Sequence, residues 1–173
     1  MFRYCPSCAS QNIRFEREKV FRCPDCGFTY YHNIAAATGC VIQAGGKVLF
    51  LVRGKEPAKG RLDLPGGFVD RGEGALEGLR RELREEIGWE PPGDAKLELF
   101  ASFPNVYPYK GIVYYTCDLF FTVEAPGLRE EDFRLEPAEI EGLRFADPKE
   151  IKSEELAFDS TRRAVEAFLK RRR

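Results

Sequence analysis

Carboxylates are crowded into one short stretch of the sequence, at spacings that could bind a cation. The stretch holds five of them, namely Glu73, Glu77, Glu82, Glu85 and Glu86. On a helix that turns by about 100° per residue, the last three fall within one sector of about 100°. Residues 82 and 86 are i,i+4 neighbours, so without a cation between them their carboxylates repel each other, more strongly where water is excluded. Because Mg²⁺ prefers oxygen ligands and is typically completed by substrate phosphate, this spacing indicates a magnesium site.

Four of the six cysteines form two Cys-x-x-Cys pairs, Cys5 with Cys8 and Cys23 with Cys26. The second pair begins 15 positions after the first one ends, which is the spacing of a four-cysteine zinc site. Four thiolates would close the coordination sphere of Zn²⁺, so we expect a structural ion with no open position for a substrate. A redox motif would need only one such pair beside a βαβ unit.

The composition of the whole chain excludes several broad classes of protein. The 173 residues include 27 Lys and Arg against 28 Asp and Glu, so the strong basic field of a dedicated nucleic-acid binder is missing. With 43% hydrophobic residues the chain is too apolar to be disordered. Its longest apolar runs, such as residues 34–42, are far shorter than the roughly 18 residues of a membrane span, and its first residues show no signal peptide. We therefore expect a cytoplasmic protein with no membrane partner.

The residues around the cysteine pairs predict a small zinc ribbon over residues 1–33, ahead of a main domain over residues 34–173. Residues 13–16 and 19–21 would form the hairpin of the ribbon. A ribbon can also bind nucleic acid, and this hairpin has basic residues with interleaved phenylalanines. Two glutamates dilute the positive charge, so we do not expect nucleic acid as a partner. His32 would serve as a linker residue or in a stacking contact.

The main domain has the pattern of a mixed α/β fold. We expect strands at residues 36–43, 47–53, 97–102, 113–123 and 143–146, and helices at residues 75–87 and 159–170. In the first helix, one apolar stripe would consist of Leu76, Leu79, Leu83 and Ile87. The loop before this helix contains Gly66 and Gly67, which permit close backbone approach and could aim a carbonyl at the ion. The start of the helix offers free N–H groups to phosphate oxygens.

Residues 67–89 resemble the Nudix box, Gly-x5-Glu-x7-Arg-Glu-U-x-Glu-Glu-x-Gly-U, where U is a bulky aliphatic residue. All fixed positions match, and the one departure is Trp89 at the final position. The resemblance implies a Nudix α/β/α sandwich from about residue 36 onward. The expected fold class is therefore α/β, a Nudix sandwich with a small N-terminal four-cysteine zinc ribbon. The implied activity is hydrolysis, dependent on Mg²⁺ or Mn²⁺, of a nucleoside diphosphate linked to another moiety.

The resemblance also implies roles for individual residues. The metal ligands would be Glu82, Glu85, Glu86 and the carbonyl of Gly66. Gly67 would lie beside the substrate, and Glu73 and Arg81 would be the supporting pair that orients the loop against the helix. The general base varies within the family, so either the first of the helix carboxylates or a carboxylate from a later loop could serve. In that later loop Glu139 is our first candidate and Glu136 the second, with a solvated surface acid as the alternative for each.

A zinc ribbon ahead of a Nudix domain resembles the NADH pyrophosphatase family, which cleaves dinucleotides such as NAD(H). That family also shows Ser-Gln-Pro-Trp-Pro-Phe-Pro downstream of the box. Residues 102–108 keep the Ser and the two outer Pro residues of that motif but lack the Gln, the Trp and the middle Pro. Three aromatic residues would line the substrate pocket or fill the sheet edge, namely Phe103, Tyr107 and Tyr109. The expected substrate is a dinucleotide or a nucleotide sugar such as ADP-ribose.

Several alternatives stay open at this point. The substrate could be a nucleoside triphosphate, because the box positions a diphosphate and says little about what is attached to it. The chain could also be a nucleotide-sensing or RNA-associated module with little catalysis, although the intact carboxylates and the near-zero net charge argue against this. The complete box disfavours an isomerase. Many relatives are homodimers, and no sequence feature fixes the oligomeric state.

Overall fold

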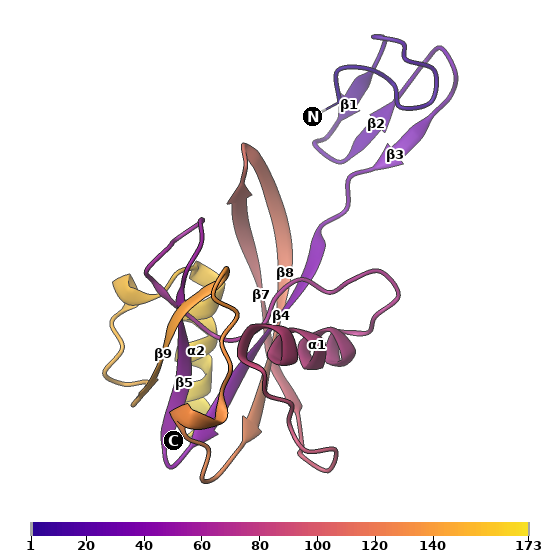
Figure 1. Ribbon diagram of the computed structural model, residues 1–173. Coiled ribbons are helices and arrows are strands. Elements are labelled where there is room, and N and C mark those ends of the chain that lie inside the picture. The colour runs from indigo at the N-terminus through magenta and orange to yellow at the C-terminus, as the bar shows by residue number, and fades with distance from the viewer. Residues whose placement is uncertain (1, 173) are drawn as a thin grey trace. The chain divides into compact units, whose positions relative to one another are not determined.

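The computed structural model describes residues 2–172 (Figure 1). The chain divides into two compact units, a small one that ends at Ile34 and a large one that begins at Ala35. Within the described residues, no helix is long and apolar enough to cross a membrane.

The small unit contains a three-stranded antiparallel sheet. Its strands are β1 (Arg14–Glu16), β2 (Val20–Arg22) and β3 (Thr29–Tyr31), with β2 in the middle. Phe21 is buried in the central strand and stacks on Phe15, at a distance of 4.2 Å between ring centroids. The sequence predicts the first two strands but not β3, whose residues are all exposed and show no apolar alternation.

The large unit is built on a sheet of six strands. They are β4 (Ala35–Ala44), β5 (Lys47–Arg53), β6 (Leu62–Asp63), β7 (Glu98–Tyr109), β8 (Ile112–Glu124) and β9 (Ile140–Ala146). The order across the sheet is β6-β5-β4-β8-β7, and β9 pairs with β5. Strand β4 runs parallel to β8, and the other pairs are antiparallel. Because β4 and β5 pair only next to their turn, the two strands diverge beyond it (Figure 1).

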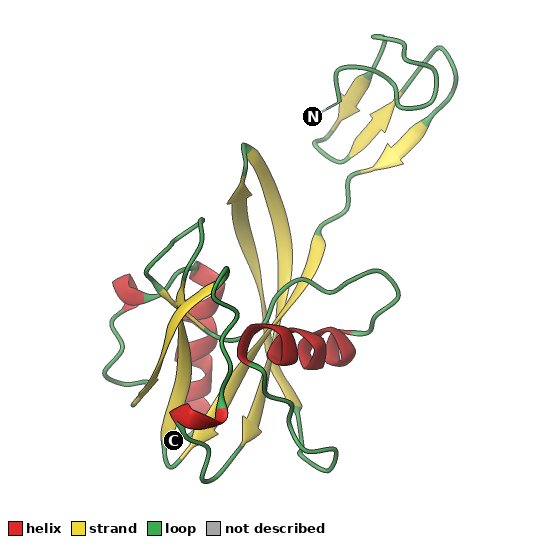
Figure 2. Cartoon of the chain, viewed as in Figure 1, coloured by secondary structure: helices red, strands yellow, loops and turns green. Residues whose placement is uncertain are grey.

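Two helices cover opposite faces of this sheet, α1 (Ala75–Ile87) and α2 (Asp159–Arg171) (Figure 2). Side chains along a strand alternate between its two faces. On β4, Ile42 belongs to the core cluster of α1, whereas the adjacent Val41 belongs to that of α2. Leu49 and Phe50 of β5 divide in the same way. This arrangement confirms the expected α/β/α sandwich. The unit also contains two short 3₁₀ helices, at Glu130–Asp132 and Ser153–Glu155.

Helix α1 begins and ends where the sequence predicts. The carboxylate of Glu77 accepts a hydrogen bond from the backbone N–H of Gly74, at 2.7 Å, and so caps the start of the helix. Gly88 ends the helix in the left-handed conformation, with φ of 61°, and its N–H donates to the carbonyl of Arg84.

The buried face of α1 differs from the prediction at one position. Leu79, Leu83 and Ile87 are fully buried, but Leu76 is 41% exposed, so the predicted stripe is wrong there. The buried residue of this turn is Gly78, where an added side chain would meet the carboxylate of Glu73 at 3.1 Å. The loop before the helix packs on Gly78, and Leu76, two residues earlier, stays partly exposed.

Strand β7 is longer than the sequence predicts. Its prolines suggest that residues 102–108 form a loop, but the strand continues through Pro104 and Pro108, which stay in register with β8. Strand β7 lies at the edge of the sheet, where a residue without an N–H costs no hydrogen bond on the free side. The extension carries Tyr107 to the cavity described below.

We expect Leu83→Ala to lower the free energy of unfolding by about 2–5 kcal/mol, because it removes a fully buried side chain from the core beneath α1. The matched control is Leu76→Ala on the same helix, which removes the same side chain from an exposed position and should cost less than about 1 kcal/mol. Urea denaturation followed by the fluorescence of Trp89 measures both values. Equal losses in the two variants would contradict the assignment of the buried face.

Candidate active site

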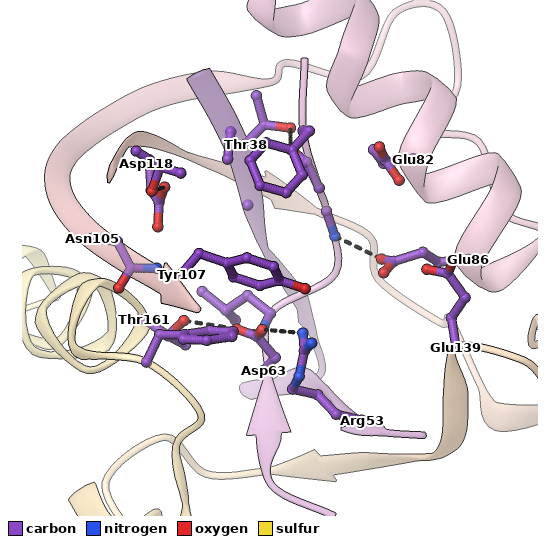
Figure 3. Close-up of a pocket in the computed structure, with 18 of the residues that line it drawn as sticks. Thr38, Arg53, Asp63, Glu82, Glu86, Asn105, Tyr107, Asp118, Glu139 and Thr161 are labelled. Atoms are coloured by element: carbon purple, nitrogen blue, oxygen red, sulfur yellow. Dashed lines mark hydrogen bonds and ion pairs between the residues drawn. The ribbon is translucent and has the colours of Figure 1, made fainter. Parts of the chain in front are cut away.

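The large unit contains a cavity of about 530 Å³ (Figure 3). Its wall is formed by β4, β5, the loop after β6, α1, β7, β8, the segment before β9 and the start of α2. Segments far apart in the sequence therefore meet around one space. The volume is typical of sites that hold a small organic ligand.

The loop after β6 runs along β4 because that strand donates hydrogen bonds to it. The N–H of Thr38 donates to the carbonyl of Gly67 at 2.8 Å, and the N–H of Cys40 donates to the carbonyl of Pro65 at 2.9 Å. Gly66 lies between these bonds with φ of 142°, and a side chain on it would lie 2.2 Å from the carbonyl oxygen of Thr38. Only glycine fits there, so the loop can pass this close to β4.

The carboxylates predicted to bind metal line the cavity from helix α1. Glu86 accepts a hydrogen bond from the N–H of Gly66 at 2.8 Å, which connects the helix to the glycine loop. Glu82 lies against Gly67, where an added side chain would meet its carboxylate carbon at 2.6 Å. Glu85 also lines the cavity, with its side chain 60% exposed. Gly66 and Gly67 line the same cavity, so all the predicted ligands lie on its wall, whereas within residues 2–172 only the four cysteines form a group whose ligand atoms all lie within 4.8 Å of one another.

Burial and like charge act on these carboxylates. Burial raises the pKa of Glu86 to about 8, the Gly66 N–H opposes part of this rise, and negative charge on Glu82 and other nearby carboxylates adds to it. Burial also raises the pKa of Glu82, while its hydrogen bond from Arg81 acts in the other direction. Among residues 2–172, no lysine or arginine forms an ion pair with Glu86. A divalent cation held by oxygen ligands would offset both the burial and the repulsion.

Arg81 connects the glycine loop to the helix. Its guanidinium donates to both carboxylate oxygens of Glu73, at 2.8 and 3.0 Å, and to the carbonyl of Phe68 at 2.8 Å. It also donates to Glu82 at 2.8 Å and to Glu85 at 3.0 Å. The hydrogen bonds from Arg81 lower the pKa of Glu73. Glu73 and Arg81 are therefore in the contact that a supporting pair would need.

The segment before β9 brings two more of the predicted carboxylates, Glu136 and Glu139, to the cavity. Glu139 lies beside Glu86 in Figure 3 and pairs with the ammonium of Lys55 at 2.5 Å. The carboxylate of Glu136 instead accepts from the backbone N–H of Ala138, at 3.1 Å, and so stabilises its own turn. The two carboxylates therefore differ in their partners, a lysine ammonium for Glu139 and a backbone N–H for Glu136.

Of the three aromatic residues predicted to line the pocket, Tyr107 does so and Phe103 and Tyr109 do not. Phe103 belongs to the core cluster of α2 and lies beneath the guanidinium of Arg163. Tyr109 ends β7 and carries the ammonium of Lys110 over its ring. Three other aromatic residues line the cavity instead, namely Phe68, Phe120 and Phe158.

A second polar group lines the cavity and was not expected from the sequence. Asp63 accepts hydrogen bonds from the hydroxyl of Thr161 at 2.7 Å and from the guanidinium of Arg53 at 3.2 Å. Burial raises the pKa of Asp63, and the charge of Arg53 opposes the rise. The Nη2 atom of Arg53 is buried and has no hydrogen-bond partner within residues 2–172, so this wall holds one free donor. These residues come from β5, β6 and α2, and no local spacing links them.

Asn105 and Asp118 also line the cavity, on the side of Tyr107 away from Glu82 and Glu86 (Figure 3). A signal for one of them was present in the sequence, because Asp118 is the only charged residue between positions 112 and 123. A lone carboxylate in an apolar strand is costly unless something pairs with it.

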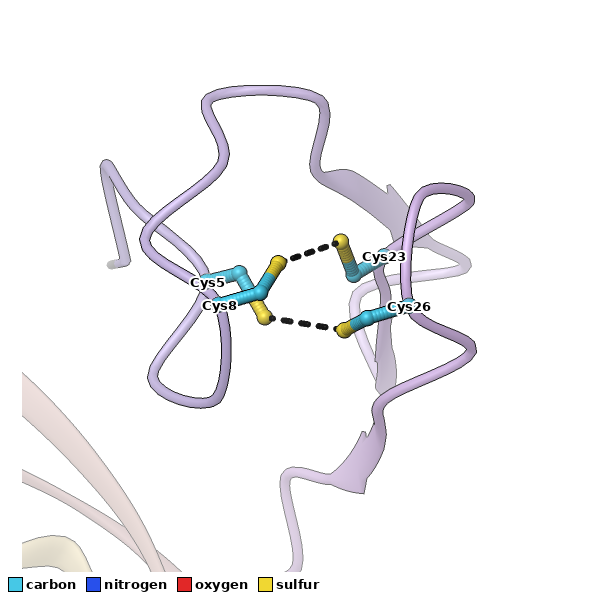
Figure 4. Close-up of side chains that lie close together, drawn as sticks. All are labelled: Cys5, Cys8, Cys23 and Cys26. Atoms are coloured by element: carbon cyan, nitrogen blue, oxygen red, sulfur yellow. Dashed lines mark hydrogen bonds between the residues drawn. The ribbon is translucent and has the colours of Figure 1, made fainter.

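The four cysteines of the small unit form a cluster in which all sulfurs lie within 4.8 Å of one another (Figure 4). The Sγ atoms of Cys5 and Cys26 are 3.6 Å apart, and those of Cys8 and Cys23 are 3.7 Å apart. A tetrahedral zinc ion with bonds of about 2.3 Å places its sulfurs about 3.8 Å apart, so the donors fit this ion. His32 lies edge-on to Phe15 and Phe21, so it makes an aromatic contact, with edge-to-face rather than stacked geometry.

Curated proteins with similar sequences include two kinds of hydrolase. The NAD-capped RNA hydrolase NudC of Pseudomonas aeruginosa is 31% identical over 107 residues, which are 62% of this chain and 37% of that protein. The ADP-ribose pyrophosphatase of Methanocaldococcus jannaschii is 38% identical over 73 residues, which are 42% of this chain and 43% of that protein. The matches therefore span less than half the length of either relative.

Solved structures with the same fold include a NUDIX hydrolase of Nitrosomonas europaea. It aligns with a TM-score of 0.71 and 23% identity, over 99% of this chain and 92% of its own. The NUDIX domain of Shewanella oneidensis NrtR, solved in complex with ADP ribose, aligns with a TM-score of 0.64 and 20% identity, over 83% of this chain and 91% of its own. At these identities the likeness shows the fold alone.

The family match covers the whole of the α/β/α sandwich core and the cavity within it. The NUDIX domain matches residues 32–168, which include every residue of the cavity wall. The chain therefore belongs to the NUDIX domain family.

Proposed function

We propose that the chain is a Nudix hydrolase that uses Mg²⁺ or Mn²⁺ to cleave the pyrophosphate bond of a nucleoside diphosphate linked to another moiety. The observation that carries this proposal is the meeting of the α1 carboxylates with the Gly66-Gly67 loop at one cavity. The most suitable substrates are a dinucleotide such as NAD(H) and a nucleotide sugar such as ADP-ribose. The names of the relatives support this class, since they include an ADP-ribose pyrophosphatase.

The oxygen-rich donor set suits a hard divalent cation. Glu82, Glu85, Glu86 and the carbonyl of Gly66 would hold it, and the cation would offset the burial and the nearby negative charge that raise the pKa of Glu86. When bound, the cation would supply a Lewis acid for phosphoryl oxygens and for water.

The residues of the chain prepare this site before a substrate arrives. The N–H of Gly66 fixes the carboxylate of Glu86, and the guanidinium of Arg81 fixes those of Glu82 and Glu85. Groups that are already oriented need little reorganisation during the reaction. Glu139 would accept the proton of the attacking water, with Glu82 as the alternative base. Attack by water needs no covalent enzyme intermediate.

The names of several relatives favour a second candidate substrate, NAD joined to the 5′ end of RNA. It contains the same kind of pyrophosphate bond as NAD(H), so the same carboxylates would serve. Cleavage of this substrate would make RNA a partner, contrary to the expectation from the near-zero net charge. A nucleoside triphosphate remains the third possibility.

We also propose that residues 1–33 form a zinc ribbon and residues 34–173 the Nudix domain. The close agreement of the two measured sulfur separations, 3.6 and 3.7 Å, with tetrahedral geometry supports a structural Zn²⁺. A cytoplasmic location stays a prediction from the sequence. Many relatives are homodimers, but no sequence feature fixes the oligomeric state of this chain.

Glu86→Gln should lower kcat by about 10³-fold or more, because it removes a negatively charged ligand from the site that stabilises the transition state. The assay combines purified protein and Mg²⁺ with NADH, ADP-ribose, a nucleoside triphosphate and NAD-capped RNA, and measures the nucleoside monophosphate, NMN or monophosphorylated RNA released. The matched control is Glu77→Gln, in the first turn of the same helix and exposed, where glutamine can still cap the N–H of Gly74.

Hydrolysis by Glu86→Gln at the rate of the unchanged protein would refute the proposed function. So would a failure of the unchanged protein to hydrolyse any of the four substrates with either Mg²⁺ or Mn²⁺.

The stability of the magnesium-free protein should depend on pH through Glu86. Its pKa is about 8 in the folded protein and near 4.5 when unfolded, so between these values the folded state holds a proton that the unfolded chain has lost. The free energy of unfolding therefore falls as pH rises through this window. Glu86→Gln removes this contribution and should be more stable than the unchanged protein by about 1–3 kcal/mol at pH 8, with little difference at pH 4.5.

Urea denaturation followed by the fluorescence of Trp89, the only tryptophan, reports on the large unit alone. The buffer contains no added divalent cation. If the free energy of unfolding changes with pH in the same way in both proteins from pH 4.5 to pH 8, Glu86 is not the group that causes the pH dependence.

Purified protein should contain about one zinc ion per chain, and Cys23→Ser combined with Cys26→Ser should reduce this to less than about a tenth, because two of the four sulfur donors are lost. The control is Cys117→Ser, which changes a cysteine outside the cluster. Elemental analysis by mass spectrometry measures the zinc. Equal zinc in the double variant and the control would exclude the ribbon as the zinc site.

A further inference from the structure

The end of the cavity formed by β7, β8 and the start of α2 has no part in the proposed chemistry. Asn105 and Asp118 lie there, and in Figure 3 Tyr107 separates them from the α1 carboxylates. In a nucleoside diphosphate derivative, the group joined to the diphosphate must also lie somewhere in this cavity. The polar residues at this end are therefore candidates for recognising it.

The carboxylate of Asp118 is held rigidly, and it still has capacity to accept hydrogen bonds. The residue is only 8% exposed, and its two oxygens accept from the hydroxyls of Thr116 at 2.5 Å and Ser160 at 2.6 Å. An ionised carboxylate offers about four lone-pair positions, so about two remain free. Within residues 2–172 no lysine or arginine pairs with it. The carboxylate can therefore accept a further hydrogen bond from a ligand in the cavity.

Asn105 supplies a second contact on the same side of the sheet. It lies opposite Thr116 in the pairing of β7 with β8, and Thr116 and Asp118 are two residues apart on β8, so all three side chains share one face. In the part of the chain from residue 2 to 172, no side chain or backbone group bonds to the Asn105 amide, although the residue is half-buried and lines the cavity. Its NH₂ group can donate and its carbonyl oxygen can accept.

We propose that Asp118 and Asn105 recognise a nucleobase that carries an exocyclic amino group, an inference that rests on the proposed function. The amino group donates to the carboxylate of Asp118, and the ring nitrogen next to it accepts from the amide of Asn105. Adenine presents this pair of groups at neighbouring positions. The aromatic wall that includes Tyr107 and Phe120 provides flat apolar surface for the ring.

The test compares ADP-ribose with IDP-ribose, in which an oxo group replaces the amino group of the base. ADP-ribose is chosen because its adenine carries the only NH₂ group in the molecule, whereas NADH also has a carboxamide NH₂ on its nicotinamide ring. We expect kcat/KM for ADP-ribose to be about 10- to 100-fold higher than for IDP-ribose, since the oxo group would face the carboxylate of Asp118.

Asp118→Asn should reduce or reverse this preference. The new NH₂ group can donate to the oxo group of IDP-ribose, so KM for IDP-ribose should fall. KM for ADP-ribose should rise about 10-fold, while kcat stays within about twofold. A purely structural role in joining β8 to α2 would change both substrates equally. Asp94→Asn, an exposed position outside the cavity, is the matched control.

Asn105→Leu provides a second variant if Asp118→Asn does not fold, because Asn105 lies on the edge strand and makes no side-chain hydrogen bond within residues 2–172. This variant should also lower the ratio of kcat/KM for ADP-ribose to kcat/KM for IDP-ribose. Equal kcat/KM for the two substrates in an active enzyme would overturn this inference and leave the proposed function intact. Failure to hydrolyse these two compounds and every other substrate named above would overturn the proposed function itself, and equal dissociation constants of ADP-ribose and IDP-ribose by calorimetry would then overturn the base recognition as well.

Discussion

Three carboxylates at one edge of a helix can stay together only if positive charge or N–H groups face them, and this requirement explains how the site is built. Arg81 faces Glu82 and Glu85, and the backbone N–H of Gly66 faces Glu86. The second contact needs a loop that passes close to β4, which the positive φ of Gly66 allows. Even so, the pKa of Glu86 stays raised, to about 8. The chain thus supplies part of the compensation, and a divalent cation would supply the rest.

The rest of the fold holds this loop in its position beside β4. Strands β4 and β5 diverge beyond their turn, and the loop after β6 takes hydrogen bonds from β4 in the region where β5 has left it. Helix α1 then covers one face of the sheet and α2 the other, so each face has its own buried core. The start of α2 also delivers Thr161 and Ser160 to the carboxylates of Asp63 and Asp118. One cavity therefore has the α1 carboxylates at one end and a second polar end that contains Asn105 and Asp118.

The sequence predicts the parts of this site that depend on local spacing. Residues of one helix keep fixed angular positions, so α1 and its carboxylates could be placed before the structure was known. Leu76 was misplaced because the packing of the preceding loop on Gly78 is a tertiary contact. The course of β7 was missed because its prolines suggest a loop unless the strand is known to lie at an edge. Asn105, Asp118 and the partners of Asp63 come from separate elements, which only strand register and the packing of α2 on the sheet bring together.

Calorimetric titration with Mn²⁺ decides whether the α1 carboxylates form a divalent cation site. Because burial raises the pKa of Glu86 to about 8, we expect Mn²⁺ binding at pH 7 to release a proton, seen as a dependence of the heat on the buffer. In Glu86→Gln the binding should weaken by about 10- to 100-fold, and the proton release should disappear. Mn²⁺ binding of equal affinity and equal proton release in both proteins, or no binding to either, would rule out this cation site.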